Sequence, residues 1–92
     1  RTETFSAAHR LHSPHLSDQE NQALYGKCNN RHGHGHNYRL EVLIEGPVDE
    51  RTGMVMNLVD LTALLKERVL NLLDHRHLDC DVEWFASRPS TT

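Results

Sequence analysis

Two segments of the chain alternate apolar and polar positions with the period of two that is typical of β-strands. In residues 1–11, the series on the apolar side is Phe5, Ala7, His9 and Leu11. The second segment is clearer, and the series on its apolar side is His36, Tyr38, Leu40, Val42 and Ile44. We therefore predict two strands, followed by a turn over residues 49–53 and a short third strand over residues 54–57.

A helical period replaces this alternation after residue 57. Asn57 is suited to cap a helix that has Asp60 at its third position. The apolar stripe of this helix is Leu61, Leu64, Leu65, Leu72 and Leu73. Earlier in the chain, Ser17 and Glu20 have the spacing of a capping box for a shorter helix, which Gly26 ends. The pattern predicts an α+β fold, an antiparallel β-sheet with helices packed on one face.

The composition is that of a single globular domain, which we expect to cover residues 1–92. Charged residues make up 25% of the chain, and the formal net charge of −3 argues against nucleic-acid binding, which needs a basic face. No apolar run approaches the roughly 20 residues that span a bilayer, so we expect no membrane partner. Two cysteines are too few for a disulfide framework and favour a reducing, cytoplasmic location.

Histidine is the outlying residue type, with eight among 92 residues. His34 and His36 share one side if the second strand extends back through Gly35, and His9 lies on the apolar side of the first strand. If the two strands pair with these sides together, three imidazoles meet at one edge of the core. Three histidines with an open fourth position form a catalytic zinc arrangement, because substrate oxygens can bind there.

The alternative is an exposed polar loop that is simply rich in histidine. His-x-His pairs are common, so the spacing alone is a weak signal for a metal. His32 has the same parity as His34 and His36 and competes for a ligand role, although Gly33 makes extended geometry less favourable there. The remaining histidines are expected to be exposed or hydrogen-bonded side chains: His12, His15, His32 and His77.

Cys28 lies six residues before His34, among polar neighbours that make a buried apolar role unfavourable. A thiol close to a zinc ion can ionise and act as a base or nucleophile. Cys80 lies between two aspartates, and we expect it to be inert. Asp74 and His75 could form a carboxylate–imidazole pair, although from the spacing alone the favoured explanation is a helix C-terminus, where His75 interacts with the last carbonyls and the helix dipole.

Six short blocks carry a family resemblance. In order from Phe5 to Thr92, they are FSAAHRL, GKCNN, GHGHNY, GMVMNL.DL, LDH..LD and STT. Together they resemble the 6-pyruvoyl-tetrahydropterin synthase family of tunnelling-fold pterin enzymes. The resemblance implies a four-stranded antiparallel sheet with two helices on one face. It also implies trimers whose sheets join into a barrel, and two such trimers stacked into a homo-hexamer.

The resemblance implies a role for each matching residue. The implied zinc ligands are His9, His34 and His36, the implied catalytic residues are Cys28, Asp74 and His75, and the implied pterin-binding residues are Thr91 and Thr92. Asp74 and His75 would reach the pocket from an adjacent subunit. As a separate hypothesis, the substrate's triphosphate would meet a cationic side chain, with Arg10, Lys27 and Arg31 as candidates.

The implied activity is that of a carbon–oxygen lyase acting on phosphates. It converts 7,8-dihydroneopterin triphosphate to 6-pyruvoyl-tetrahydropterin and triphosphate in tetrahydrobiopterin biosynthesis, with one Zn²⁺ per subunit and Mg²⁺ for the triphosphate. The alternatives are 6-carboxytetrahydropterin synthase of deazapurine biosynthesis and a non-catalytic zinc-binding assembly module. The family anchors the pterin through a glutamate in a late strand, which these residues do not reach. We therefore expect an N-terminal portion of the domain, inactive by itself.

Overall fold

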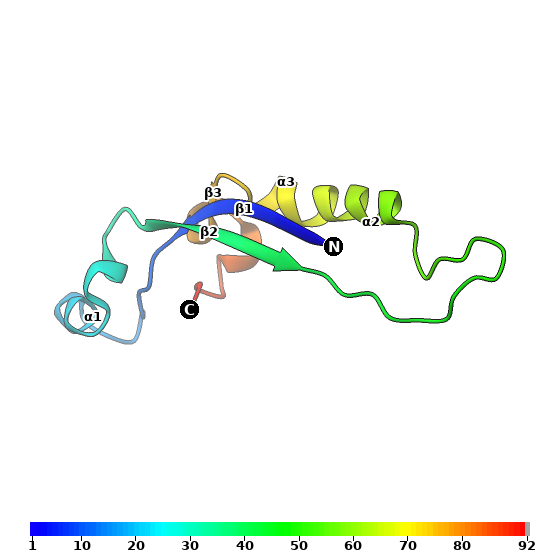
Figure 1. Ribbon diagram of the computed structural model, residues 1–92. Coiled ribbons are helices and arrows are strands. Elements are labelled where there is room, and N and C mark those ends of the chain that lie inside the picture. Colours follow the sequence, from blue (N-terminus) through cyan, green and yellow to red (C-terminus); the bar gives the residue numbers. More distant parts are fainter. Residues whose placement is uncertain (92) are drawn as a thin grey trace.

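The centre of the fold is an antiparallel strand pair to which a short third strand is added (Figure 1). The computed structural model describes residues 1–91. Strands β1 (Thr2–His9) and β2 (His34–Glu41) pair along their whole length, as the alternation predicts. Strand β3 (Arg76–His77) pairs with the other edge of β1 and runs parallel to it. The sheet is therefore mixed rather than wholly antiparallel.

The predicted start and end of the first helix are confirmed. Helix α1 (Asp18–Tyr25) begins after Ser17, whose hydroxyl accepts a hydrogen bond from the backbone N–H of Glu20. The carboxylate of Glu20 in turn accepts from the backbone N–H of Ser17, which completes the capping box. Gly26 ends the helix at φ +54°, a conformation that glycine adopts without steric cost. A 3₁₀ turn, η1 (Gly26–Asn29), follows and leads towards β2.

The predicted second helix is also present. Helix α2 (Leu58–Leu65) is capped by Asn57, whose side chain accepts from the backbone N–H of Val59. It continues through a π-helical turn, η2 (Lys66–Leu70), into α3 (Asn71–Leu73), which contacts β1. Two short elements complete the described chain, α4 (Leu78–Asp81) and the 3₁₀ turn η3 (Glu83–Phe85). The α+β class is confirmed.

The apolar core lies between the sheet and these helices. Its buried members are Ala7, Leu11, Leu61, Leu65 and Leu78. The predicted helical stripe is only half buried, because Leu64 and Leu72 remain exposed. None of the helices within residues 1–91 is long and apolar enough to cross a membrane.

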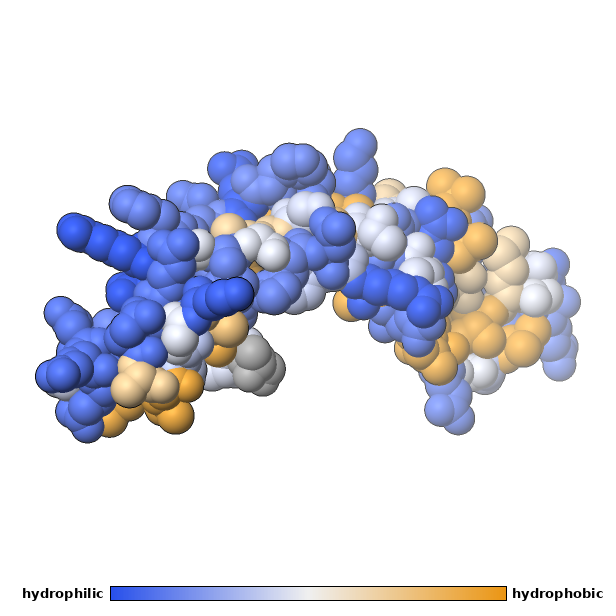
Figure 2. Space-filling model, turned by 60° about the vertical axis from the view of Figure 1, so that its left-hand side comes forward, coloured by the Kyte–Doolittle hydropathy of each residue, from blue (hydrophilic) through white to orange (hydrophobic). Residues whose placement is uncertain are grey.

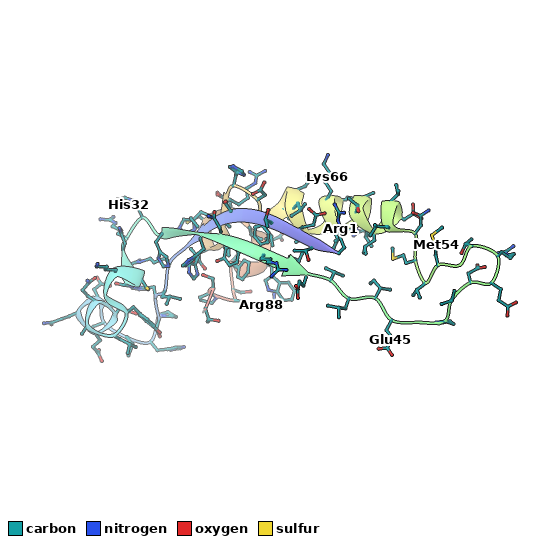
Figure 3. The ribbon with its side chains drawn as sticks, viewed as in Figure 1. Arg1, His32, Glu45, Met54, Lys66 and Arg88 are labelled. Carbon is teal, nitrogen blue, oxygen red and sulfur yellow. The ribbon has the colours of Figure 1, made fainter. Side chains whose placement is uncertain are left out.

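The predicted third strand over residues 54–57 is wrong. These residues belong to a long open loop between β2 and α2, at the far right of Figure 1. Figure 3 shows Glu45 and Met54 on the two arms of this loop, away from the sheet. A strand needs a neighbour to complete its ladder of hydrogen bonds. No strand within the described residues lies beside this segment to supply one.

Apolar side chains gather on the surface around this loop and the start of α2. They form part of the distant right-hand lobe in Figure 2. The exposed members are Leu43, Ile44, Val48, Met54, Val55, Met56, Leu58 and Val59. Such an exposed apolar surface is unusual for an isolated domain.

Candidate metal centre

The register between β1 and β2 brings three histidines onto one face of the sheet. His9 lies directly opposite His34, and Ala7 lies opposite His36. Side chains two positions apart in a strand point the same way, so His34 and His36 share the face that carries His9. The predicted meeting of these three side chains is therefore what the strand pairing produces.

The three rings surround one point. Their centroids lie 4.6 Å apart for His9 and His34, 5.0 Å for His9 and His36, and 4.7 Å for His34 and His36. One ring nitrogen from each lies within 4.8 Å of the others. The Nε2 atoms of His9 and His36 are 3.1 Å apart. Two imidazole nitrogens on one tetrahedral zinc ion are about 3.3 Å apart, given zinc–nitrogen bonds of about 2.0–2.1 Å.

Burial increases from the mouth to the base of this cluster. His36 is exposed, His34 is half-buried, and His9 is only 2% exposed. Burial lowers the pKa of His9 below its ordinary value, and the neighbouring His34 and His36 lower this pKa further. His9 is therefore neutral near pH 7, which is the protonation state that a metal ligand needs.

The cluster fits a metal ion by a second observation. The Nδ1 atom of His34 is buried and has no hydrogen-bond partner among the described residues. A buried polar atom without a partner destabilises a fold, so native proteins rarely leave one unexplained. Three imidazoles with an accessible side suit zinc, and the exposed position of His36 leaves that side open.

Comparison with known proteins gives the family. A family model described as "6-pyruvoyl tetrahydropterin synthase" matches residues 1–92. The chain belongs to this family. The resemblance in the six sequence blocks is thereby confirmed.

Individual relatives agree with this family assignment. The chain is 59% identical over 92 residues to the 6-pyruvoyl tetrahydrobiopterin synthase of Drosophila melanogaster, covering 100% of this chain and 55% of that protein. It is 55% identical over 89 residues to the Homo sapiens protein of the same name, covering 97% and 61%. The solved Caenorhabditis elegans 6-pyruvoyl tetrahydropterin synthase superimposes with a TM-score of 0.81 at 48% identity, covering 99% and 64%. The chain thus spans less than two thirds of these relatives.

Cys28, in the GKCNN block, lies in η1 ahead of β2. Its thiol is half-buried and free, and it is not part of the histidine cluster. The backbone carbonyl of Cys28 accepts a hydrogen bond from the backbone N–H of Leu11, at 2.9 Å. This contact fixes the turn that carries the thiol and leaves its sulfur uncommitted.

Asp74 and His75 form the predicted pair. The Nδ1 atom of His75 lies 3.0 Å from the carboxylate of Asp74, which also accepts a hydrogen bond from the backbone N–H of Ser6. This backbone bond lowers the pKa of Asp74 below its ordinary value, and the contact with His75 lowers it further. His75 has a φ of +60°, a left-handed conformation that is uncommon outside glycine. Its side chain is 84% exposed.

The pair is not part of the group of converging nitrogens, although His75 and His36 line one surface hollow. His75 lines a surface hollow with Ser6 and Asn37, whose side chains hydrogen-bond to each other at 2.7 Å. By the alternation of the strands, Ser6 and Asn37 lie on the sheet face opposite to His9 and His36. The exposed ring of His75 is thus available to another polypeptide.

The C-terminal end of the described chain returns to the cluster. Thr91 is exposed and follows Ser90, which is only 6% exposed and whose hydroxyl lies 3.1 Å from Nδ1 of His9. Thr92 lies outside the described residues. Asp79 accepts hydrogen bonds from both the backbone and the hydroxyl of Ser90. Asp79 and Ser90 occur in the LDH..LD and STT blocks, but nothing in their spacing indicates that they meet.

Of the four histidines predicted to be exposed or hydrogen-bonded, three are. His15 and His32 are exposed, and Figure 3 shows His32 at the turn before β2. His12 contacts the side-chain amide of Asn29 at 3.0 Å. His77 does not fit, because it is half-buried and its Nδ1 has no hydrogen-bond partner among the described residues. The parallel pairing of β3 with β1 draws it inward, which a pattern of alternation cannot reveal.

Gly33 fits closely beneath this histidine. Its φ is +85°, and a Cβ at this position would lie 2.6 Å from Nε2 of His77 and 3.0 Å from the carbonyl oxygen of His9. A left-handed backbone conformation costs an alanine about 1–2 kcal/mol. We expect Gly33→Ala to lower the free energy of unfolding of the full-length protein by more than this, because of the added overlap. Gly53→Ala is the control, since Gly53 has a φ of +72° but open space around it. Urea unfolding of both variants measures the difference, and equal destabilisation would contradict the predicted overlap.

Proposed function

We propose that the protein containing this chain is a zinc-dependent lyase. It converts 7,8-dihydroneopterin triphosphate to 6-pyruvoyl-tetrahydropterin and triphosphate, a step of tetrahydrobiopterin biosynthesis. The observation that carries the proposal is the convergence of His9, His34 and His36 on one point, in a chain that belongs to the 6-pyruvoyl tetrahydropterin synthase family. Relatives that bear the synthase name and match nearly all of this chain support it.

The three histidines of the cluster would hold the zinc ion. When bound, zinc supplies Lewis acidity that makes carbon–hydrogen bonds beside a coordinated oxygen easier to ionise. Cys28 is the proposed base that removes such a proton, because its thiol is free and uncommitted. The 6-carboxytetrahydropterin alternative places its cysteine four residues before the histidine pair, so His32 would have to be a ligand. Cys28 precedes His34 by six residues, which favours the reaction proposed here. His32 is exposed and lies outside the cluster.

A second proton is handled by His75. Asp74 contacts Nδ1 of His75, so this nitrogen carries the ring proton and Nε2 is free to accept another. The carboxylate keeps its charge because the backbone N–H of Ser6 lowers its pKa. Since the ring is 84% exposed and is not part of the converging cluster, we propose that it serves the site of a neighbouring subunit.

Substrate binding would involve the C-terminal end of the chain and a cationic hollow. We propose that Thr91 and Thr92 hold the pterin ring, which is supported by the return of this segment to His9 through Ser90. Arg10 and Arg31 line one surface hollow together with Asn30, which supports a role in meeting the triphosphate. Mg²⁺ would accompany the triphosphate, because its oxygens are the hard ligands that this ion prefers.

The proposed assembly is a homo-hexamer built as a dimer of trimers. The exposed apolar side chains of the long loop and the start of α2 support extensive association with further polypeptide. β2 is an edge strand within the described residues, and such a strand can extend a sheet across an interface. We also propose a cytoplasmic location, which the two free cysteines support.

Product analysis tests the proposal. The zinc-loaded, full-length protein is incubated with 7,8-dihydroneopterin triphosphate and Mg²⁺, and the products are identified by mass. We expect inorganic triphosphate and 6-pyruvoyl-tetrahydropterin in equal amounts. Formation of 6-carboxytetrahydropterin would instead place the protein with its deazapurine relative. A protein that binds zinc tightly without any turnover would be the non-catalytic module.

A further inference from the structure

A chain of hydrogen bonds leads from the histidine cluster to a carboxylate. His9 is contacted at Nδ1 by the hydroxyl of Ser90 at 3.1 Å, and this hydroxyl donates to Oδ2 of Asp79 at 2.8 Å. The chain links β1 to α4 and to the segment after η3: Ser90 lies 81 residues from His9 in the sequence and 11 from Asp79. His9 and Ser90 are 2% and 6% exposed, so water has little access to the bonds between them.

Asp79 acts only as an acceptor in this chain. Its Oδ1 accepts from the backbone N–H of Ser90 at 2.8 Å, and its Oδ2 accepts from the backbone N–H of Arg10 at 2.9 Å. A backbone N–H can only donate, so both carboxylate oxygens present lone pairs to these partners. Burial raises the pKa of Asp79, but these bonds and the one from the Ser90 hydroxyl outweigh that effect and lower the pKa below its ordinary value.

The direction of the next bond follows. The hydroxyl of Ser90 has one proton, and that proton is donated to Asp79. Ser90 therefore offers only a lone pair to His9, so Nδ1 of His9 must carry the ring proton. In a neutral imidazole this leaves Nε2 with its lone pair free. Nε2 is the atom of His9 that faces Nε2 of His36 in the cluster.

We propose that Asp79 and Ser90 are positioning residues that fix His9 as its Nδ1–H tautomer and aim its Nε2 at the metal. Outer-shell partners of this kind orient metal-binding histidines and make them stronger ligands. The inference rests on the proposed metal site, and it adds two residues that lie outside the group of converging nitrogens. It also gives the half-buried carboxylate of Asp79 a function beyond accepting hydrogen bonds from backbone groups.

Ser90→Ala in the full-length protein tests this hydrogen-bond chain from Asp79 through Ser90 to His9. This change removes the hydroxyl but keeps the backbone bond from residue 90 to Asp79. We expect zinc affinity, measured by competition with a chelator, to fall 10–100-fold. The matched control is Ser87→Ala, which removes an exposed hydroxyl three residues earlier in the same segment and should leave zinc affinity unchanged. Equal affinities in wild type and Ser90→Ala would overturn the proposal.

A spectroscopic measurement on the unmodified protein guards against a variant that misfolds. Long-range ¹H–¹⁵N spectra of the zinc-free, full-length protein report which nitrogen of each histidine carries the proton. We expect His9 to be the Nδ1–H tautomer in wild type and to lose that preference in Ser90→Ala and Asp79→Asn. If His9 is the Nε2–H tautomer in wild type, the proposed roles of Asp79 and Ser90 are wrong even if turnover is normal. Absent turnover with the expected tautomer would count against the proposed function alone.

Discussion

Replacing His36 with alanine in the full-length protein should lower zinc affinity at least 100-fold and abolish turnover. The change removes one of the three nitrogens that converge on the metal point, whereas losing only an outer-shell partner costs 10–100-fold. His36 is the exposed member of the cluster, so its truncation leaves no cavity in the core. Metal content per subunit and a chelator-competition titration measure the loss, and an unchanged circular dichroism spectrum verifies the fold.

His32→Ala is the matched control for this experiment. His32 precedes the cluster by two residues and has the same strand parity, but it is exposed and lies outside the group of converging nitrogens. We expect its removal to leave zinc content and turnover unchanged. If His32→Ala loses zinc while His36→Ala keeps it, the assignment of the ligands is wrong, and the ligand pair is His32 and His34, four and six residues after Cys28.

Replacing Cys28 with alanine should lower kcat about 10²- to 10⁴-fold without removing zinc. A positioned general base contributes a factor of that size, and the sulfur is not among the converging metal ligands. The carbonyl of residue 28 still accepts from the backbone N–H of Leu11 in the variant, so the turn keeps its anchor. Steady-state turnover together with metal analysis of the same sample separates the two effects.

Cys80→Ala controls for the loss of a thiol as such, because Cys80 is exposed on α4 and has no proposed role. Its kcat should equal that of wild type. Unchanged turnover in Cys28→Ala would remove this residue from the mechanism. Loss of zinc in Cys28→Ala would instead show that the thiol is a metal ligand.

Features that depend on neighbouring residues could be predicted from the sequence. The capping box of Ser17 and Glu20 and the cap at Asn57 are formed within one helical turn, so residue type and spacing decide them. The histidine cluster joins two strands that are distant in the sequence, but it could also be predicted. Its members inherit their direction from the alternation of each strand, and antiparallel pairing then brings the matching faces together.

Features that depend on distant partners could not be predicted. The contact of Asp79 with Ser90, and of Ser90 with His9, requires knowing how three separate segments fold together. The apolar run at residues 54–57 has strand character, but a strand also needs an adjacent strand, and none of the described residues provides it. The exposure of Leu64 and Leu72 has the same origin, because amphipathic spacing shows a stripe without showing how much of it is covered.

The pairing of His9 with His34 also has a consequence for folding. A shift of the β1–β2 alignment by a single residue would turn every side chain of one strand to the other face, and the three imidazoles would separate. If the cluster holds zinc as proposed, the ion would bind only the correctly aligned strand pair, and free metal would shift the folding equilibrium towards it by mass action. The ion would thereby stabilise the correct strand register in addition to its proposed role in catalysis. Cells short of zinc would then accumulate misaligned chains in addition to inactive enzyme.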